Sequence, residues 1–483
     1  MSDVTYTRKD YDAALPDWLL VSDACAGERS VKARGATYLP RPNPLDQRRE
    51  AEERYRQYLA RACYYNATGR TLAGLVGAAF RVDPVAKFPA ALKYLETDAS
   101  GAGVSVYQQS QATLANVLQK GRHALYVDYP ATESPATLAQ QRAGQIRANI
   151  ITVNAEQVIN WRTVVIGGVH KLALVVIREI VEEIDGFGVA EVEQWRALEL
   201  AGGAYSVTVW RKNEKGEPVI VSQVFPRDGA GNVWDQIPFT FVGAQNNDHS
   251  VDTPPLVDLA RVNIAHYRNS ADYEDSVFFV GQVQPYIIGV DDVWAIEAQK
   301  AGLYIGSRSP IMLPLGASFG LAQAAPNSMV REAMQDKERQ MIALGARLIS
   351  KGEAVKTATE AQADSEVEHS VLSLCVKNVS EAYTQAIRWC ARFMNAPDSG
   401  IEYSINTQFA EKSFDPQALT ALVAAWQAGR IPSSDMTANL QRMGVISSEK
   451  SQDDVAGELE LETAGLGLDQ PGSLNDGNAT GIN

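Results

Sequence analysis

The spacing of hydrophobic and polar residues predicts helices near the start of the chain and strands in its middle. Residues 46–79 and 109–121 place apolar side chains three or four positions apart, which indicates helices. Residues 123–130, HALYVDYP, predict one strand that ends at a proline. Residues 150–243 contain β-branched and aromatic segments separated by turn sequences such as NEKGE and RDGAGN. These segments predict an antiparallel meander of five or six strands.

Three long helices are predicted after the Pro-Pro pair at 254–255. The first, 256–278, has an apolar stripe, and about 25 residues would span roughly 38 Å. The second, 328–349, follows the capping sequence Asn-Ser. The third, 359–394, repeats apolar residues at i+3 and i+4. Between the first two lies an excursion, 281–326, for which Gly, Pro and short apolar runs predict short strands.

The two ends of the chain have a different character. Residues 1–45 contain four prolines and no long apolar period, so we expect an irregular arm. Residues 401–409 alternate like a strand, and 415–446 predict a helical hairpin whose first helix stops at Gly429. From Ser447 the tail is acidic and then rich in Gly, Asn and Ser, which is typical of disorder. With the central strands, the predicted fold class is α+β.

Charge and composition limit the class of partner. The chain has 483 residues and a net charge of −14, so a strong, sequence-independent grip on DNA is not expected, because duplex DNA is densely negative. It contains no apolar run of 18 residues, which predicts no membrane span, and its first residues lack a signal-peptide pattern. The four cysteines form no CxxC pair, so we expect reduced, buried thiols rather than a zinc ribbon.

Motifs for catalysis or cofactors are missing from the sequence. The phosphate-binding GxxxxGK[ST] loop, the dinucleotide fingerprint, HExxH and GxSxG are absent. The five histidines are scattered without ligand spacing. We therefore expect no cofactor, no metal and no enzymatic activity.

One stretch nevertheless resembles a catalytic site in its residue types: IAHYRNSADYEDSVFFVGQ, residues 264–282. On a helix, His266 and Tyr273 share one face, whereas Arg268, Asp272 and Asp275 share an adjacent face. A His–Asp dyad is therefore geometrically poor, and the arginine beside the acids would keep them charged rather than ready to act as general acids. We interpret these five side chains as an assembly surface offered to neighbouring subunits. The alternative is a metal-dependent hydrolase that uses the carboxylates of helix 256–278.

The order of the elements supports the assembly interpretation. Two amphipathic helices of similar length flank the excursion, and a polar loop leads to the third helix. A helical pair that projects a small module cannot bury all of its faces alone. A closed ring of identical subunits would supply the missing neighbours.

Four segments carry a resemblance to a known family. They are PFTFVGAQNNDHSVDTPPLVDLARVNIAHYRNSADYEDSVFFVGQVQPYIIGV (238–290), EQVINWRT (156–163), ERQMIALGARL (338–348) and KTATEAQADS (356–365). Through them the chain resembles the portal, or head–tail connector, proteins of tailed bacteriophages over roughly residues 45–450. It is most similar to a subgroup whose core is catalogued as a domain of unknown function.

The resemblance implies a ring, usually of twelve subunits, at one capsid vertex of a virion made in the bacterial cytoplasm. Such a ring is a conduit for DNA packaging and ejection. Its parts would be a wing (46–250, with the long helix and strand of 361–412), stem helices (251–280 and 327–349), a clip (281–326), a tunnel loop (350–360) and a crown (413–447). The arm (1–45) and the tail (448–483) fall outside this pattern.

The resemblance also implies partners and contact residues. Double-stranded DNA would pass the tunnel-loop residues Ser350, Lys351, Lys356 and Thr357, although both lysines could be ordinary solvated side chains. Tyr304 and Arg308 would contact a partner at the clip, or Arg308 could cap a turn. The expected protein partners are the terminase large subunit, a head–tail adaptor and the major capsid or scaffolding protein, with no membrane. A different virion component, such as a minor capsid protein, stays open as an alternative.

Overall fold

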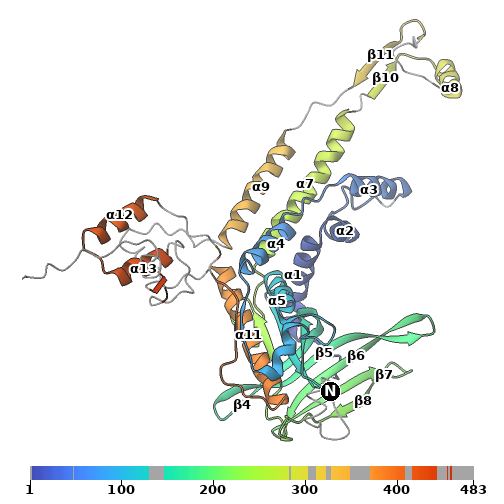
Figure 1. Cartoon of the computed structure of the whole chain (residues 1–483). Coiled ribbons are helices and arrows are strands. Elements are labelled where there is room, and N and C mark those ends of the chain that lie inside the picture. Colours follow the sequence, from blue (N-terminus) through green and yellow to red (C-terminus); the bar gives the residue numbers. More distant parts are fainter. Residues whose placement is uncertain are drawn as a thin grey trace, which may run out of the picture. The chain divides into compact units, whose positions relative to one another are not determined.

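The computed structural model contains both helices and sheets, in agreement with the predicted α+β class (Figure 1). The chain divides into two compact units, Met1–Phe409 and Ala410–Asn483. The structure describes residues 3–46, 48–129, 146–281, 284–302, 312–322, 328–348, 370–407, 409, 416–442, 454, 457 and 458.

A five-stranded antiparallel meander forms one sheet of the first unit, in the order β4-β5-β6-β7-β8. The predicted meander is therefore confirmed with five strands. Its bounds are β4 Val158–Ile166, β5 Val169–Asp185, β6 Gly188–Ala201, β7 Ala204–Lys212 and β8 Pro218–Val224.

The flanking strands of the predicted meander belong to a second, three-stranded sheet of order β3-β2-β9. The predicted strand at 123–130 is its central strand, β2, Arg122–Asp128, and it pairs antiparallel with both neighbours. A turn of 3-10 helix, η3 (Ala155–Gln157), separates β3 (Asn149–Asn154) from β4. The last strand, β9, spans Phe239–Gly243.

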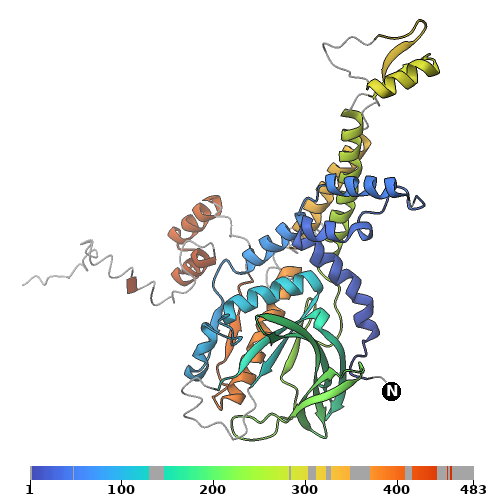
Figure 2. The ribbon, with the colours of Figure 1, turned by 90° about the vertical axis from the view of Figure 1, so that its right-hand side faces the viewer.

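Helices α5 (Val106–Lys120) and α11 (Val371–Phe393) pack against this second sheet, and they run beside the strands in cyan and orange in Figure 2. A capping box of Ser105 and Gln108 starts α5. Gly121 ends it at a φ of +66°, and a Cβ there would lie 2.4 Å from the carbonyl oxygen of Asp252, so only glycine fits. The predicted third helix is confirmed over 371–393, while 359–369 lies outside the described residues.

The chain's first 45 residues are not the irregular arm that the prolines predicted. They form α1 (Lys9–Ala26), α2 (Glu28–Ala33) and the turn η1 (Gly35–Thr37), and α1 packs on α4, α5 and α7. Trp18, Val21 and Ala24 are fully buried at helical spacing. Pro16 lies inside α1, where it costs one backbone hydrogen bond that the burial of this face outweighs.

The predicted helical stretch 46–79 is confirmed and consists of two helices. α3 spans Arg49–Arg61, and α4 spans Ala67–Ala79 after the Asn66 side chain accepts from the backbone N–H of Gly69 at 2.8 Å. Short elements complete this part of the unit: β1 (Val85–Lys87) pairs with β12 (Glu402–Ser404), and η2 spans Ala90–Glu96.

Helices α7 (Val257–Gly281) and α9 (Met329–Arg347) pack against each other, as their matched lengths suggested. The excursion between them holds the antiparallel pair β10 (Gln284–Ile288) and β11 (Ser318–Ala322). It also holds a helix, α8 (Asp292–Ala301), where only strands were predicted. Asp291 caps α8 by accepting from the backbone N–H of Trp294, a local signal that the Gly and Pro pattern concealed.

The second unit contains the predicted helical hairpin. Its helices are α12 (Pro416–Gln427) and α13 (Ser433–Arg442), and Gly429 follows the first at a φ of +70°. The prediction for the tail beyond Ser447 falls almost entirely outside the described residues.

Candidate assembly surface on the paired helices

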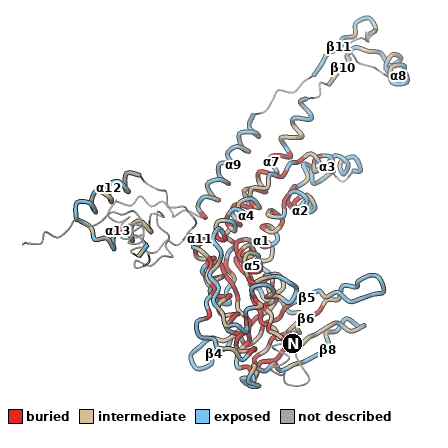
Figure 3. Tube along the Cα trace, viewed as in Figure 1, coloured by how far each residue is buried: buried red, intermediate tan, exposed pale blue. Residues whose placement is uncertain are grey.

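The five side chains predicted to form an assembly surface all lie on α7, which changes character along its length. Its first half is built into the core through Leu259, Ala260, Ile264, Tyr267 and Ala271. Its last turns expose three consecutive apolar residues, 277–279 (Figure 3). The switch from a buried to an exposed helix occurs within the stretch that looked catalytic.

Asp272 and Asp275 bind α3 of the same chain. The Tyr58 hydroxyl donates to Asp272 Oδ1 at 2.5 Å, and Arg61 donates to Asp275 Oδ1 at 2.7 Å. The Arg61 guanidinium also lies 3.9 Å from the ring centre of Phe278, at cation–π distance. These contacts join α3 to the second half of α7, and we call them the α3–α7 clamp.

Arg268 is not the partner of these acids, contrary to the sequence interpretation. Its Nε donates to the backbone carbonyl of Tyr38 at 2.7 Å. Helical periodicity placed Arg268 on the same face as the acids, but α3 and the 34–39 segment bring closer partners to each. The clamp residues Tyr58 and Arg61 of α3 were missed, although they lie three positions apart on their helix, as Asp272 and Asp275 do on α7.

His266 is buried and therefore offers no surface to a neighbouring subunit, which corrects its predicted role. Its Nε2 lies 3.4 Å from Glu338 Oε1 of α9, a weak contact between the paired helices. Burial lowers the pKa of His266, and the carboxylate of Glu338 opposes that shift only in part. The separation of His266 from Asp272 and Asp275, which bind a different helix, agrees with the prediction that no His–Asp dyad forms. Tyr273 is half-buried.

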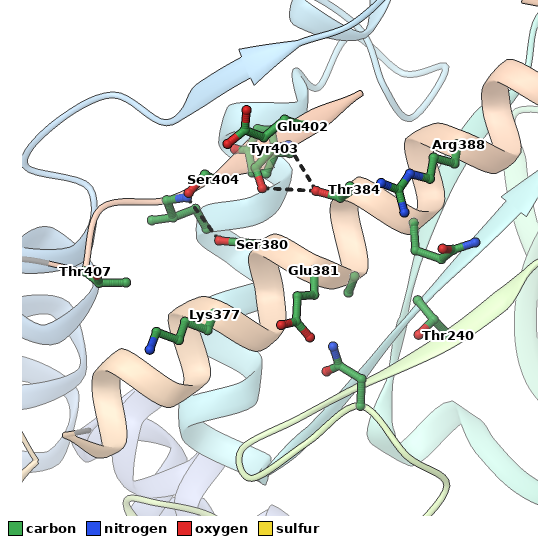
Figure 4. Close-up of a pocket in the computed structure, with 14 residues that line it drawn as sticks. Thr240, Lys377, Ser380, Glu381, Thr384, Arg388, Glu402, Tyr403, Ser404 and Thr407 are labelled. Atoms are coloured by element: carbon green, nitrogen blue, oxygen red, sulfur yellow. Dashed lines mark hydrogen bonds between the residues drawn. The ribbon is translucent and has the colours of Figure 1, made fainter. Parts of the chain in front are cut away.

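A polar cleft of about 620 Å³ lies along α11 (Figure 4). Lys377, Glu381 and Arg388 line it from the helix. Across the cleft, the hydroxyls of Ser380 and Thr384 bond the backbone of Ile405 and Tyr403, which closes the edge of β12. The lining holds carboxylates and cations and has no histidine or cysteine.

The carboxylates of α7 do not gather with other potential metal ligands in the described residues. Within that part of the chain, no group of three His, Cys, Asp or Glu side chains could hold a metal ion. In the same residues, no helix is both long and apolar enough to cross a bilayer. Cys375 and Cys390 are buried as predicted, whereas Cys63 is exposed, and all four thiols are free.

The remaining predicted site residues lie outside the described residues. These are Ser350, Lys351, Lys356 and Thr357 of the tunnel loop and Tyr304 and Arg308 of the clip. Their roles stay predictions.

Comparison with known proteins gives one family match. Residues 255–394 match a domain of unknown function, DUF4055. The matched segment runs from α7 through the excursion and α9 to α11. The predicted match to a family catalogued as a domain of unknown function is confirmed for this segment, which is shorter than the 45–450 expected, and the family description names no function. No curated protein sequence matches the chain.

Two solved structures are similar to the chain at low identity. A chain in the virion of a native gene transfer agent (GTA) particle is 14% identical with a TM-score of 0.40, and the match covers 86% of this chain and 98% of that one. A chain in the neck of a native GTA particle, computed with C12 symmetry, is 12% identical with a TM-score of 0.35, covering 85% and 98%.

Proposed function

We propose that this chain is the subunit of a portal ring in a tailed-phage-like virion. The observation that carries the proposal is the α7/α9 pair, which leaves large apolar side chains exposed among the described residues. The sequence of residues 238–290 resembles portal proteins, and this resemblance is the reason for proposing a portal ring rather than another kind of ring. The family match spans the same helices but carries no functional description of its own.

The uncovered residues lie on both helices. Phe279 of α7 is 68% exposed, and Met329 and Ile342 of α9 are each 73% exposed. Residues 277–279 point in directions about 100° apart around the helix axis, so α9, on one side, cannot cover all three. Neighbouring copies on either side would cover these side chains. In a closed ring every copy has two neighbours, so no helix pair stays exposed.

The charge of the chain suits a conduit. A chain with a net charge of −14 is expected to bind DNA weakly, because both are negatively charged. Tight binding to the phosphates, with release of counterions, would slow the movement of DNA through the ring. We therefore propose that DNA passes through the ring while separate proteins, a terminase and later an adaptor, bind its excursion between α7 and α9. The capsid or scaffolding protein would bind elsewhere on the ring.

Replacing Ile342 with serine is expected to weaken ring assembly without unfolding the subunit. Ile342 lies about 100° around α9 from the buried Met341, so it faces away from the chain's own core. Loss of its interfacial burial should raise the subunit concentration for half-assembly about fivefold, as measured by mass photometry over a dilution series.

The neighbouring Gln340→Ser is the matched control, because it changes an exposed polar side chain on the same turn. An Ile342→Ser protein that assembles at the same concentration as the control would remove the helix pair from the proposed interface.

A further inference from the structure

The five-stranded sheet projects two hairpins that its own core does not cover. Strand β5 has 17 residues, about 58 Å of extended chain, yet only its middle, near 173–177, is buried. It turns from β4 at Gly167–Gly168 and into β6 at Gly186–Phe187. Because both turns belong to one strand, the hairpins lie at opposite ends of the sheet, and the β5–β6 hairpin extends far from the body in Figure 1.

The β5–β6 hairpin, residues 178–193, is apolar and acidic, and we call it the acidic hairpin. Phe187 at its tip is fully exposed, and Ile184 beside it is 90% exposed. The hairpin has six carboxylates and one arginine. Glu182 lies directly across from Glu191 in the strand pairing, and neither has an ion-pair partner among the described residues. Two like charges that face each other repel. A positively charged side chain of another molecule would therefore stabilise this pair.

The β4–β5 hairpin, residues 162–171, is apolar and basic, and we call it the basic hairpin. Val165, Ile166 and Val169 are exposed at its tip. It has no carboxylate but contains Arg162, His170 and Lys171. Lys171 reaches Asp235 at 3.6 Å. The exposed side chains of Arg162 and His170 have no ion partner in the part of the chain that the structure describes.

We propose that the acidic hairpin of one copy packs on the basic hairpin of the next copy. Each presents a β ribbon with exposed aliphatic side chains, and the unpaired charges, on Glu182 and Glu191 in one hairpin and on Arg162 in the other, are of opposite sign. Because the two surfaces differ and lie at opposite ends of one sheet, the contact is head-to-tail, which is the kind that closes into rings. The inference rests on the proposed ring and names the second copy as the occupant of both hairpins.

Charge reversal on the full-length protein tests this contact. Glu182→Arg with Glu191→Arg should raise the concentration for half-assembly at least about tenfold, because like charges then face each other across the interface. Arg162→Glu with His170→Glu should do the same. All four substitutions in one chain should bring assembly back to within about threefold of wild type, since every interface then has its charges exchanged.

Glu214→Arg, on the exposed turn between β7 and β8, is the control for a change in net charge. An unchanged melting temperature separates loss of contact from loss of fold. If wild type forms rings and either reversed pair behaves like the control, the hairpin contact is overturned while the ring stands. If the fourfold variant assembles no better than the two double variants, the pairing of these hairpins is also overturned. A wild-type protein that forms no ring overturns both.

Discussion

Replacing Asn263 with leucine is expected to lower the free energy of unfolding by about 3 kcal/mol. Asn263 lies on α7 and is fully buried. Its Oδ1 accepts from the backbone N–H and the hydroxyl of Thr68, at 3.1 and 2.8 Å, and its Nδ2 donates to the carbonyl of Tyr65 at 2.8 Å. The side chain thus caps the start of α4 from another helix. Leucine would leave these buried groups without partners.

Chemical denaturation at fixed protein concentration measures the effect. Asn116→Leu, at the surface of α5, is the matched control because that side chain bonds only within its own helix. It should shift the free energy of unfolding by no more than about 0.5 kcal/mol. An Asn263→Leu protein as stable as this control would show that the cap contributes nothing.

Lowering the pH from 7 to 5 is expected to remove about 2 kcal/mol of stability through His123. This side chain, on β2, is buried, and its Nδ1 has no hydrogen-bond partner in the structure. Burial lowers the pKa of His123 from 6.5 to about 3, and the nearby charge of Lys120 acts in the same direction. The unfolded chain therefore takes up a proton near pH 6.5, whereas the folded chain resists it until about pH 3.

The sign follows from that difference. The contribution is complete above pH 6.5 and is lost progressively as the pH falls toward 3. His266, whose pKa burial also lowers, adds in the same direction. His123→Gln should flatten the fall in stability between pH 7 and 5, whereas His249→Gln, at an exposed position, should leave it unchanged. A slope that His123→Gln does not alter would contradict the assignment.

Elements with strong periodicity were predictable from the sequence. Helices α7, α9 and α11 and the meander each repeat one pattern over many residues, so their positions followed directly. α1 and α8 were missed because Pro16 and the Gly-Pro punctuation of the excursion obscured shorter signals. The burial of one face stabilises α1 despite its internal proline, and the Asp291 cap stabilises the start of α8.

The partners of the α7 side chains were less predictable than their faces. Helical geometry correctly separated His266 from Asp272 and Asp275, because that relation is local. It could not show that Tyr58, some 200 residues away in sequence, bonds Asp272. Nor could it show that Arg268 would find a backbone carbonyl. Such contacts depend on how distant elements pack, and the matching spacing of Tyr58–Arg61 and Asp272–Asp275 does not by itself show that these two helices meet.

The measurement that most directly tests the proposed function is negative-stain imaging of the purified full-length chain, with native mass spectrometry of the same sample. The account predicts closed rings with a central opening, of about twelve copies of the 52.5 kDa chain. Assembly should be examined across a range of salt concentrations, because surface charges contribute to the contacts. A protein that stays monomeric at micromolar concentration under every condition, or forms particles without a central opening, would contradict the proposal of a portal ring.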